Sequence, residues 1–142
     1  MDYTTLGRTG LRVSVAGLGC GASNEQAARL VRHCLDQGVN LIDTAKNYGT
    51  EEAVGLALQG VPRDSVVVTT KSLVREHGGE RLAPARVVAS LDESLRALRL
   101  DHVDVFFLHA VLPEDYEHAL AVRDALSGAR RAGKFRHLGV TE

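Results

Sequence analysis

The sequence lacks any excess of charge, since its formal net charge is -1 and no run of like charge stands out. A protein that binds nucleic acid or an anionic membrane through its surface needs a positive patch. This composition therefore argues against nucleic-acid partners and against a membrane partner. The longest apolar runs are only strand length, and the N-terminus has no basic segment followed by an apolar one. We therefore expect a soluble, cytoplasmic protein.

Cysteine and lysine are both scarce. Cys20 and Cys34 are the two cysteines, and their spacing does not resemble a metal site, so no metal is expected. We interpret both as small buried thiols, because free cysteine is usually buried. There are three lysines against fourteen arginines. Because lysine is rare in this chain, Lys71 at the end of a predicted strand is harder to explain as an ordinary surface residue than it would be in a lysine-rich protein.

The overall composition is that of one ordinary globular domain. The chain has 142 residues, 44% hydrophobic and 25% charged. Residues 3–14 have the alternation and the turn residues of a β-hairpin. Short apolar strands are then predicted at 15–18, 39–43, 66–70, 103–108 and 135–140.

Four segments with helical periodicity separate these strands. They begin near Ser23, which opens a capping-box pattern, near Thr50, at Pro84 and near residue 119. Units of about thirty residues are typical of βαβ repeats, whose strands are parallel. The fold class is therefore predicted as α/β with a parallel sheet. The polar segment 72–83 is predicted to be a mobile binding loop, because it follows a strand.

Titratable residues follow the ends of three successive strands. The strand 39–43 ends in Asp43 and leads to Tyr48, the strand 66–70 leads to Lys71, and the strand 103–108 leads to His109. Parallel strands align their carboxyl ends at one rim, where α/β folds keep their chemistry. We therefore expect these four side chains to lie together, with Asp43 and Lys71 close enough for an ion pair.

Each of the four residues has an ordinary structural explanation when it is considered alone. Asp43 could cap a helix, Tyr48 could be a loop aromatic, Lys71 a solvated strand end and His109 a core histidine. It is their combination that favours a catalytic site. The remaining lysines and histidines are interpreted as surface or packing residues: Lys46, Lys134, His33, His77, His102, His118 and His137.

A dinucleotide-binding turn of the Rossmann type is disfavoured. Gly19 and Gly21 have the spacing of its first two glycines, but position 24 is Asn24 where the pattern needs a third glycine.

Four motifs, in order along the chain, resemble those of the aldo-keto reductase family. They are D-T-A-x-x-Y-G at 43–49, Lys71 after a valine-rich strand, D-V-F-F-L-H at 104–109 and G-K-F-R-H-L-G-V-T at 133–141. The resemblance covers the whole chain. It implies a (β/α)8 TIM barrel whose bottom is closed by the hairpin 1–14, with residues 15–142 supplying strands one to five of a single incomplete domain.

The resemblance also implies roles for the four residues in reducing an aldehyde or ketone to an alcohol. Tyr48 would be the general acid, supported by Lys71, Asp43 and His109. A free phenol ionises near pH 10 and donates a proton sluggishly at neutral pH, so a neighbouring cation such as Lys71 should favour the phenolate. Asp43 is a natural counter-ion for a buried Lys71. His109 would donate a hydrogen bond to the substrate oxygen.

The resemblance further implies NADPH as cofactor, bound across the rim. The matching contact positions are Gly21, Asp43, Thr141 and Glu142. Glu142 departs from an Asn common in the family, and a carboxylate can only accept where an amide both donates and accepts. This departure weakens the expected contact with the nicotinamide carboxamide.

Length sets this chain apart from a complete barrel, because eight units need well over 200 residues. Strands six to eight are missing, together with the family's loops for the adenosine, 2′-phosphate and pyrophosphate. Two hypotheses follow. The chain is the N-terminal part of an NADPH-dependent reductase, or it is a non-catalytic remnant or half-barrel that assembles with another chain. We expect the first and last strands to be open sheet edges that promote self-association, and the isolated chain to be inactive.

Overall fold

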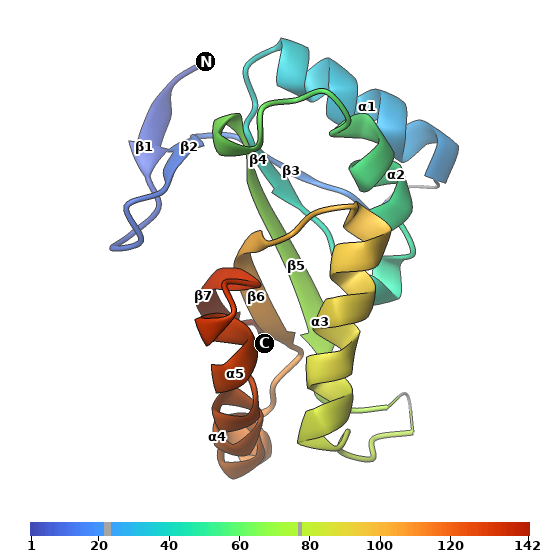
Figure 1. Ribbon diagram of the computed structural model, residues 1–142, viewed down its shortest axis with the longest axis vertical. Coiled ribbons are helices and arrows are strands. Elements are labelled where there is room, and N and C mark those ends of the chain that lie inside the picture. Colours follow the sequence, from blue (N-terminus) through green and yellow to red (C-terminus); the bar gives the residue numbers. More distant parts are fainter. Residues whose placement is uncertain (22–23, 77) are drawn as a thin grey trace.

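The computed structural model describes residues 1–21, 24–76 and 78–142. An antiparallel hairpin at the N-terminus precedes a five-stranded parallel sheet, and helices cover one face of this sheet (Figure 1). The predicted α/β class is thus confirmed. The proposed Ser23 capping box and His77 lie outside the described residues.

The sheet contains its strands in sequence order, β3-β4-β5-β6-β7, and every neighbouring pair is parallel. Residues such as Val67, Val68, Phe106 and Leu108 are buried, as is typical of parallel strands that are covered on both faces. The strand bounds are β3 (Gly17–Gly19), β4 (Leu41–Asp43), β5 (Val67–Leu73), β6 (Val103–His109) and β7 (Phe135–Val140).

The helices alternate with these strands, as the spacing predicted. Short 3-10 turns stand at the ends of several connections. The helix bounds are α1 (Asn24–Asp36), α2 (Glu51–Ala57), α3 (Pro84–Leu98), α4 (Tyr116–Ala125) and α5 (Ser127–Arg131), and the 3-10 turns are η1 (Lys46–Tyr48), η2 (Arg63–Ser65) and η3 (Pro113–Asp115).

The main hydrophobic core lies between the sheet and its helices. Ile42, Val68 and Phe106 of the sheet belong to this core, as do Leu91 of α3 and Val122 of α4, and none of these five side chains is measurably exposed. At about 25 cal/mol per Å² of buried apolar surface, such side chains each contribute roughly 1.5–3 kcal/mol. This packing orients the sheet so that its alternate residues point away from the helices.

The hairpin covers the opposite face of the sheet. Strands β1 (Tyr3–Thr5) and β2 (Arg12–Ser14) pair in antiparallel fashion, and Leu11 and Val13 pack against Val67 and Val105. Asn40, just before β4, fastens this hairpin: its side chain accepts a hydrogen bond from Ser14 N at 2.6 Å and donates one to the Arg12 carbonyl at 3.0 Å. The hairpin therefore lies at the amino end of β4, away from the carboxyl ends of the strands.

The two outer strands of the sheet are β3 and β7, and each has one paired side in the part of the chain that the structure describes. This confirms the expectation that the first and last strands are the open edges. Strand β3 is shorter than predicted, because it starts at Gly17 and leaves Val15 63% exposed.

Other boundaries also differ from prediction: for example, β4 begins at Leu41, two residues later than expected. The single helix expected near residues 119–133 is divided into α4 and α5, with Leu126 buried between them. Strand β5 runs on to Leu73, so Lys71 and Ser72 lie within the strand instead of in the loop after it. Pairing with Phe107 and Leu108 of β6 explains the extension, since a neighbouring long strand supplies the missing hydrogen-bond partners.

Candidate active site

Four titratable side chains occupy the carboxyl rim, the edge of the sheet where its parallel strands end. Asp43 is the last residue of β4, Lys71 lies near the end of β5, and His109 is the last residue of β6. Tyr48 follows β4 on the 3-10 turn η1. Asp43 is paired in register with Thr69, two residues before Lys71, so both charged side chains lie on the same face of the sheet.

Asp43 and Lys71 form an ion pair. Lys71 Nζ lies 2.6 Å from Asp43 Oδ2, as was expected for these neighbouring strands. The lysine side chain is 8% exposed and that of the aspartate 36%. A buried ammonium is costly without a counter-ion, and Asp43 supplies that counter-ion here.

Two threonines complete the surroundings of this pair, and the sequence analysis missed both. Lys71 Nζ also donates to the carbonyl oxygen of Thr44 at 2.9 Å, and the Thr69 hydroxyl donates to Asp43 Oδ1 at 2.5 Å. The carboxylate thus has one partner on each oxygen, which fixes its orientation. The period-two alternation of a strand could have identified Thr69, because it places Thr69 and Lys71 on one face.

Tyr48 lies beside the ion pair and is 38% exposed. Lys71 Nζ is 4.8 Å from the centroid of its ring, and the His109 ring meets it edge-on with centroids 6.0 Å apart. Both neighbours therefore lie beside the ring. Among the described residues, no group forms a hydrogen bond to the Tyr48 hydroxyl, so its proton and lone pairs are available to a ligand.

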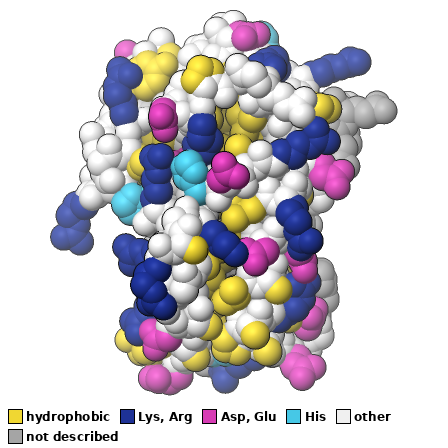
Figure 2. Space-filling view, in the orientation of Figure 1, with side chains coloured by type: hydrophobic (Ala, Val, Ile, Leu, Met, Phe, Trp, Pro, Cys, Tyr) yellow, Lys and Arg dark blue, Asp and Glu magenta, His cyan; other side chains and the backbone are white. Residues whose placement is uncertain are grey.

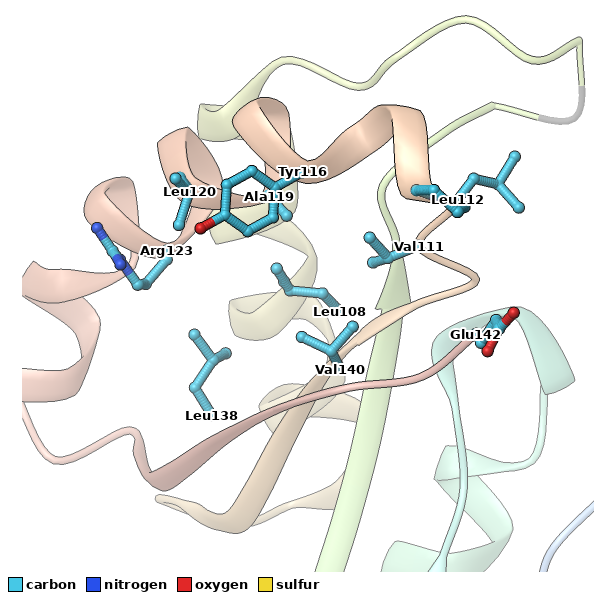
Figure 3. A pocket seen from close by; sticks show the side chains of 11 residues that line it. Leu108, Val111, Leu112, Tyr116, Ala119, Leu120, Arg123, Leu138, Val140 and Glu142 are labelled. Carbon is cyan, nitrogen blue, oxygen red and sulfur yellow. The ribbon is translucent and has the colours of Figure 1, made fainter.

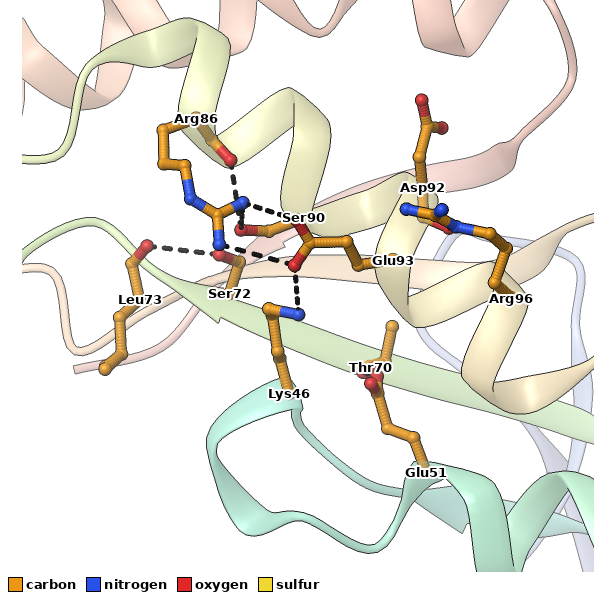
Figure 4. Close-up of polar contacts among 10 residues, drawn as sticks. All are labelled: Lys46, Glu51, Thr70, Ser72, Leu73, Arg86, Ser90, Asp92, Glu93 and Arg96. Carbon is orange, nitrogen blue, oxygen red and sulfur yellow. Dashed lines mark hydrogen bonds and ion pairs between the residues drawn. The ribbon is translucent and has the colours of Figure 1, made fainter.

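Contacts on the outer side of the sheet hold the turn that carries Tyr48 (Figure 4). Lys46, the first residue of η1, forms an ion pair with Glu93 of α3. Arg86 Nη1 lies 2.9 Å from the same carboxylate and 3.3 Å from Ser90 Oγ. The cations Lys46 and Arg86 lower the pKa of the Glu93 carboxyl, so Glu93 stays charged and continues to link the turn to α3.

His109 contacts the segment that follows β7. Its Nδ1 atom lies 2.7 Å from the hydroxyl oxygen of Thr141. Burial, and then the neighbouring Lys71 cation, lower the pKa of His109 below its ordinary value, because both disfavour a second positive charge. The imidazole is therefore neutral at pH 7.

The residues expected to contact a cofactor come from two separated parts of the rim. Gly21 follows β3, and a Cβ atom at this position would meet nothing within 4 Å, so its backbone is open to a ligand. Thr141 and Glu142 follow β7 at the other end of the sheet. The structure thus brings Asp43, Tyr48, Lys71, His109 and Thr141 together and leaves Gly21 and Glu142 at the margins.

The described residues of the segment 72–83, the predicted binding loop, make specific contacts. It forms a small antiparallel turn in which Arg75 bridges Arg81. Both arginines bind the carboxylate of Asp115 at the end of η3, and Asp115 is fully buried. A buried carboxylate thus contacts both ends of the turn, and the mobility of the segment stays a prediction.

Thr50 and the cysteines also have contacts that their sequence patterns did not reveal. Thr50 precedes α2 as expected, but its hydroxyl donates to the Cys20 carbonyl at 2.6 Å and does not cap the helix. Its oxygen also lies 2.9 Å from the hydroxyl of Thr44. Burial raises the pKa of the Cys20 thiol to about 11, whereas Cys34 is half-buried. Cys20 therefore serves as a packing residue at neutral pH.

A large hollow lies elsewhere, between α4 and the outer face of β7 (Figure 3). It has a volume of about 550 Å³ and is lined mainly by apolar side chains, among them Leu138 and Val140 of β7 and Tyr116 of α4. Tyr116 and Val140 are about 60% exposed, at 63% and 60%. We call this hollow the β7 groove. None of the four residues Asp43, Tyr48, Lys71 and His109 lines it, but Glu142, a candidate cofactor contact, lies at its margin.

The remaining surface carries charges of both signs, which are interspersed on the face seen in Figure 2. Among the described helices, none is both long and apolar enough to cross a membrane. Within the same residues, no three histidine, cysteine or acidic side chains gather in a way that could hold a metal ion.

Comparisons with known proteins place this chain and its fold in a family. The family model described as "Aldo/keto reductase family" matches residues 15–142. The aldo-keto reductase YhdN of Bacillus subtilis is 31% identical over 99% of this chain and 47% of its own length. The methylglyoxal reductase DkgB of Escherichia coli O157:H7 is 37% identical over 78% of this chain and 40% of its own length.

Solved structures agree with this result. An aldo-keto reductase of Bacillus halodurans in its holo form superposes with a TM-score of 0.85 at 28% identity, over 99% of this chain and 50% of that one. The Bombyx mori aldo-keto reductase in complex with NADP superposes with a TM-score of 0.77 at 30% identity, over 98% and 50%. The chain thus spans about half the length of the relatives it matches, and its sheet corresponds to the N-terminal part of their barrels. The chain belongs to the aldo/keto reductase family.

Proposed function

We propose that this chain is the N-terminal part of an NADPH-dependent oxidoreductase that reduces small aldehydes or ketones to alcohols in the cytoplasm. The observation that carries the proposal is the Asp43–Lys71 ion pair, whose nearly buried ammonium lies 4.8 Å from the centre of the Tyr48 ring. Residues 1–14 would close the bottom of the barrel, and residues 15–142 would supply its first five strands.

In this proposal Tyr48 is the general acid. Its hydroxyl gives a proton to the carbonyl oxygen, on which negative charge develops as the carbonyl is reduced. The positive charge of Lys71 stabilises the phenolate that the proton leaves behind, and Asp43 keeps that lysine charged and oriented. The half-exposed position of Tyr48 supports this role, because a proton donor must reach the substrate.

His109 would bind and orient the same carbonyl oxygen. A neutral imidazole can donate one hydrogen bond without placing a second cation beside Lys71. The lowered pKa of His109 supports this assignment, because it keeps the ring neutral over the physiological range. Two hydrogen-bond donors, Tyr48 and His109, would then converge on one oxygen.

The proposed cofactor is NADPH, which when bound supplies a hydride to the carbonyl carbon. Gly21, Asp43, Thr141 and Glu142 are the candidate contacts. The open backbone at Gly21 and the accepting groups of Asp43 and Glu142 are compatible with the amide and hydroxyl groups of a nicotinamide nucleoside. The Bombyx mori relative, solved with NADP, supports a nicotinamide cofactor for this family.

The second candidate function is non-catalytic: a remnant or half-barrel that assembles with another chain. The β7 groove favours it, because contiguous exposed apolar side chains beside an open sheet edge mark an association surface. For residues 1–142 alone, we expect this behaviour to dominate. Catalysis needs the hydride and proton donors fixed together, and misplacement of about 1 Å can cost roughly a hundredfold in rate.

NADPH oxidation by the purified chain with a reactive aldehyde, together with NADPH fluorescence titration, tests the proposal. We expect negligible turnover by residues 1–142 alone. The site assignment predicts turnover when the missing strands are supplied in a chimera with the C-terminal half of the Bacillus subtilis relative, and its loss in the Tyr48→Phe variant of that chimera. Turnover of about 1 per second by the 142-residue chain, abolished by Tyr48→Phe, would show instead that five strands suffice. Chimera activity that survives Tyr48→Phe would contradict the assignment of Tyr48.

A further inference from the structure

Thr141 is fastened to the end of β6 by its backbone. Its N–H donates to the carbonyl of Leu108 at 2.9 Å, and its own carbonyl accepts from the N–H of Val111 at 2.9 Å. These two hydrogen bonds extend the pairing of β6 and β7 one residue past the end of β7. They hold the Thr141 side chain next to His109, which with Ala110 lies between its two backbone partners.

The Thr141 hydroxyl has two neighbours within hydrogen-bond distance. His109 Nδ1 lies 2.7 Å from its oxygen, and the backbone N–H of Ala110 donates to the same oxygen at 3.3 Å. Ala110 has a φ of 55°, a left-handed conformation that is costly for a residue with a Cβ atom. The backbone is therefore strained at the residue immediately after His109. In this conformation the N–H groups of Ala110 and Val111 both donate hydrogen bonds to Thr141.

Counting hydrogens favours one direction for the bond to His109. A hydroxyl has one hydrogen to donate and two lone pairs, and the N–H of Ala110 occupies one lone pair. If Nδ1 carried the imidazole hydrogen, it would occupy the other lone pair, and the Thr141 hydrogen would have no acceptor among the described residues. If Thr141 donates to Nδ1, the hydroxyl hydrogen has an acceptor and the lone pair on Nδ1 has a donor.

We propose that Thr141 is a positioning residue that holds neutral His109 in the tautomer with its hydrogen on Nε2. This inference deepens the proposed function, since His109 can donate to a carbonyl oxygen only from a nitrogen that bears hydrogen. It also changes the role expected for Thr141 from the family resemblance. Its hydroxyl hydrogen is already used, so toward a cofactor Thr141 can only accept a hydrogen bond.

The other groups that face His109 come from three elements. They are the Lys71 ammonium from β5, the Asp43 carboxylate from β4 and the edge-on Tyr48 ring from η1. Lys71 disfavours the imidazolium and Asp43 favours it. Neither group hydrogen-bonds to Nδ1, so Thr141 is the described side chain that distinguishes the two ring nitrogens.

The tautomer can be measured in the 142-residue chain without cofactor or turnover. In protein labelled with ¹⁵N-histidine, long-range ¹H–¹⁵N correlation spectra at neutral pH distinguish the two tautomers of each ring. We expect His109 in the Nε2–H form. Thr141→Val keeps the side-chain shape but removes the hydroxyl, and should give a mixture of tautomers. Thr141→Ser should restore the wild-type pattern.

The titration of His109 by the same method provides a second, signed readout. A donor to Nδ1 favours the neutral ring, so its removal in Thr141→Val should raise the measured pKa of His109 by roughly 0.5 to 1. If Nδ1 donated to Thr141 instead, the same variant would lower it. A wild-type ring in the Nδ1–H form, or a falling pKa in Thr141→Val, would overturn the proposal.

Two controls separate this result from misfolding. Thr4→Val, on the exposed strand β1, should leave the His109 signals unchanged. The resonances of His33, His102, His118 and His137 should be the same in all variants. The wild-type spectrum alone determines the tautomer even if Thr141→Val fails to fold. Failure of the NADPH assay would leave this test unaffected, because it depends only on the folded rim.

Discussion

Arg75 and Asp115 are forty residues apart and follow different strands, yet they form a two-point ion pair. Arg75 Nε lies 2.7 Å from Asp115 Oδ2 and Arg75 Nη2 lies 2.6 Å from Asp115 Oδ1. Arg81 Nε adds a third contact at 2.9 Å. The strand before Arg75 carries Lys71 and the strand before Asp115 carries His109, so this Asp115 clamp joins the two segments that border the candidate site.

Removing the Asp115 charge should expose the turn at 75–81 to protease. In the wild type, Arg75 and Arg81 are held against a buried carboxylate, which restricts their entry into a trypsin active site. We expect Asp115→Asn to be cut after these arginines roughly tenfold faster or more, because local opening then controls cleavage. Mass spectrometry of timed digests measures the effect. Asp124→Asn, which removes an exposed partner of Arg123, is the matched control, and equal cleavage in both variants would contradict the clamp.

The clamp also predicts a pH dependence of stability. The two guanidiniums hold the pKa of the Asp115 carboxyl well below its usual range. An unfolded aspartate binds its proton near pH 4, while folded Asp115 remains charged to lower pH, so the unfolded chain binds more protons in between. The stability advantage of wild type over Asp115→Asn should be constant above about pH 5 and shrink as the pH falls below about 4. Urea midpoints across pH 2–7 measure it, and an advantage that grows on acidification would refute the assignment.

The Asp43–Lys71 pair predicts unequal costs for its two partners. Asp43→Asn leaves a nearly buried ammonium without a counter-ion and should lower the free energy of unfolding by about 2–3 kcal/mol. Lys71→Met leaves a carboxylate that is 36% exposed and can be hydrated, so it should cost only about 1 kcal/mol. Urea unfolding at pH 7 compares them. The double variant should be no less stable than Asp43→Asn, and the reverse order of costs would show that the lysine is not confined as described.

Arg99 offers a stabilising substitution outside the site. It follows α3 in a left-handed conformation with φ 56° and ψ 39°, which glycine adopts without strain. Arg99→Gly should raise the free energy of unfolding by about 0.5–1 kcal/mol. Arg96→Gly, in the exposed last turn of the same helix, should lower it by about 1 kcal/mol. Thermal or urea unfolding separates the two, and destabilisation by both would show that Arg99 makes a contact more valuable than its strain.

Self-association should proceed through the β7 groove. Val140 is 60% exposed beside the open side of β7, and a lysine there opposes edge pairing. We expect Val140→Lys to shift the purified chain toward the monomer in light scattering across a concentration series. Val15→Lys tests the opposite edge, where β3 has only three residues and two of them are glycines. A monomeric wild type, or equal effects of both lysines, would contradict the assignment to β7.

Local sequence patterns determined most of the architecture. The alternation in residues 3–14 specified the hairpin, and Pro84 with its apolar stripe specified the start of α3. The strand 135–140 was predicted to the residue and the strand at 103–108 to within one residue, because period-two burial and flanking turn residues are local properties. The order of the strands, and hence the meeting of Asp43 with Lys71, followed from right-handed parallel crossovers.

Only the tertiary structure decided which polar groups meet across the connections between these elements. The Thr50 hydroxyl had the local signature of a helix cap, but the Cys20 carbonyl lies within reach and takes its hydrogen bond. Lys71 was expected after its strand, but pairing with β6 prolongs β5 beyond it. In both cases a partner distant in sequence outweighed a local preference worth about 1 kcal/mol.

The clearest division is between Lys71 and Asp115. Lys71 could be selected as a candidate site residue from the sequence. Its place at the end of a predicted strand is a local pattern, and the carboxyl ends of parallel strands lie together at one rim. Asp115 could not be selected in this way. Its two arginine partners lie 34 and 40 residues earlier in the sequence, and the whole of α3 separates them from it. Hydrogen bonds and ion pairs form or fail on differences of a few tenths of an ångström in the distance between side chains. Only the packing of the folded chain sets those distances.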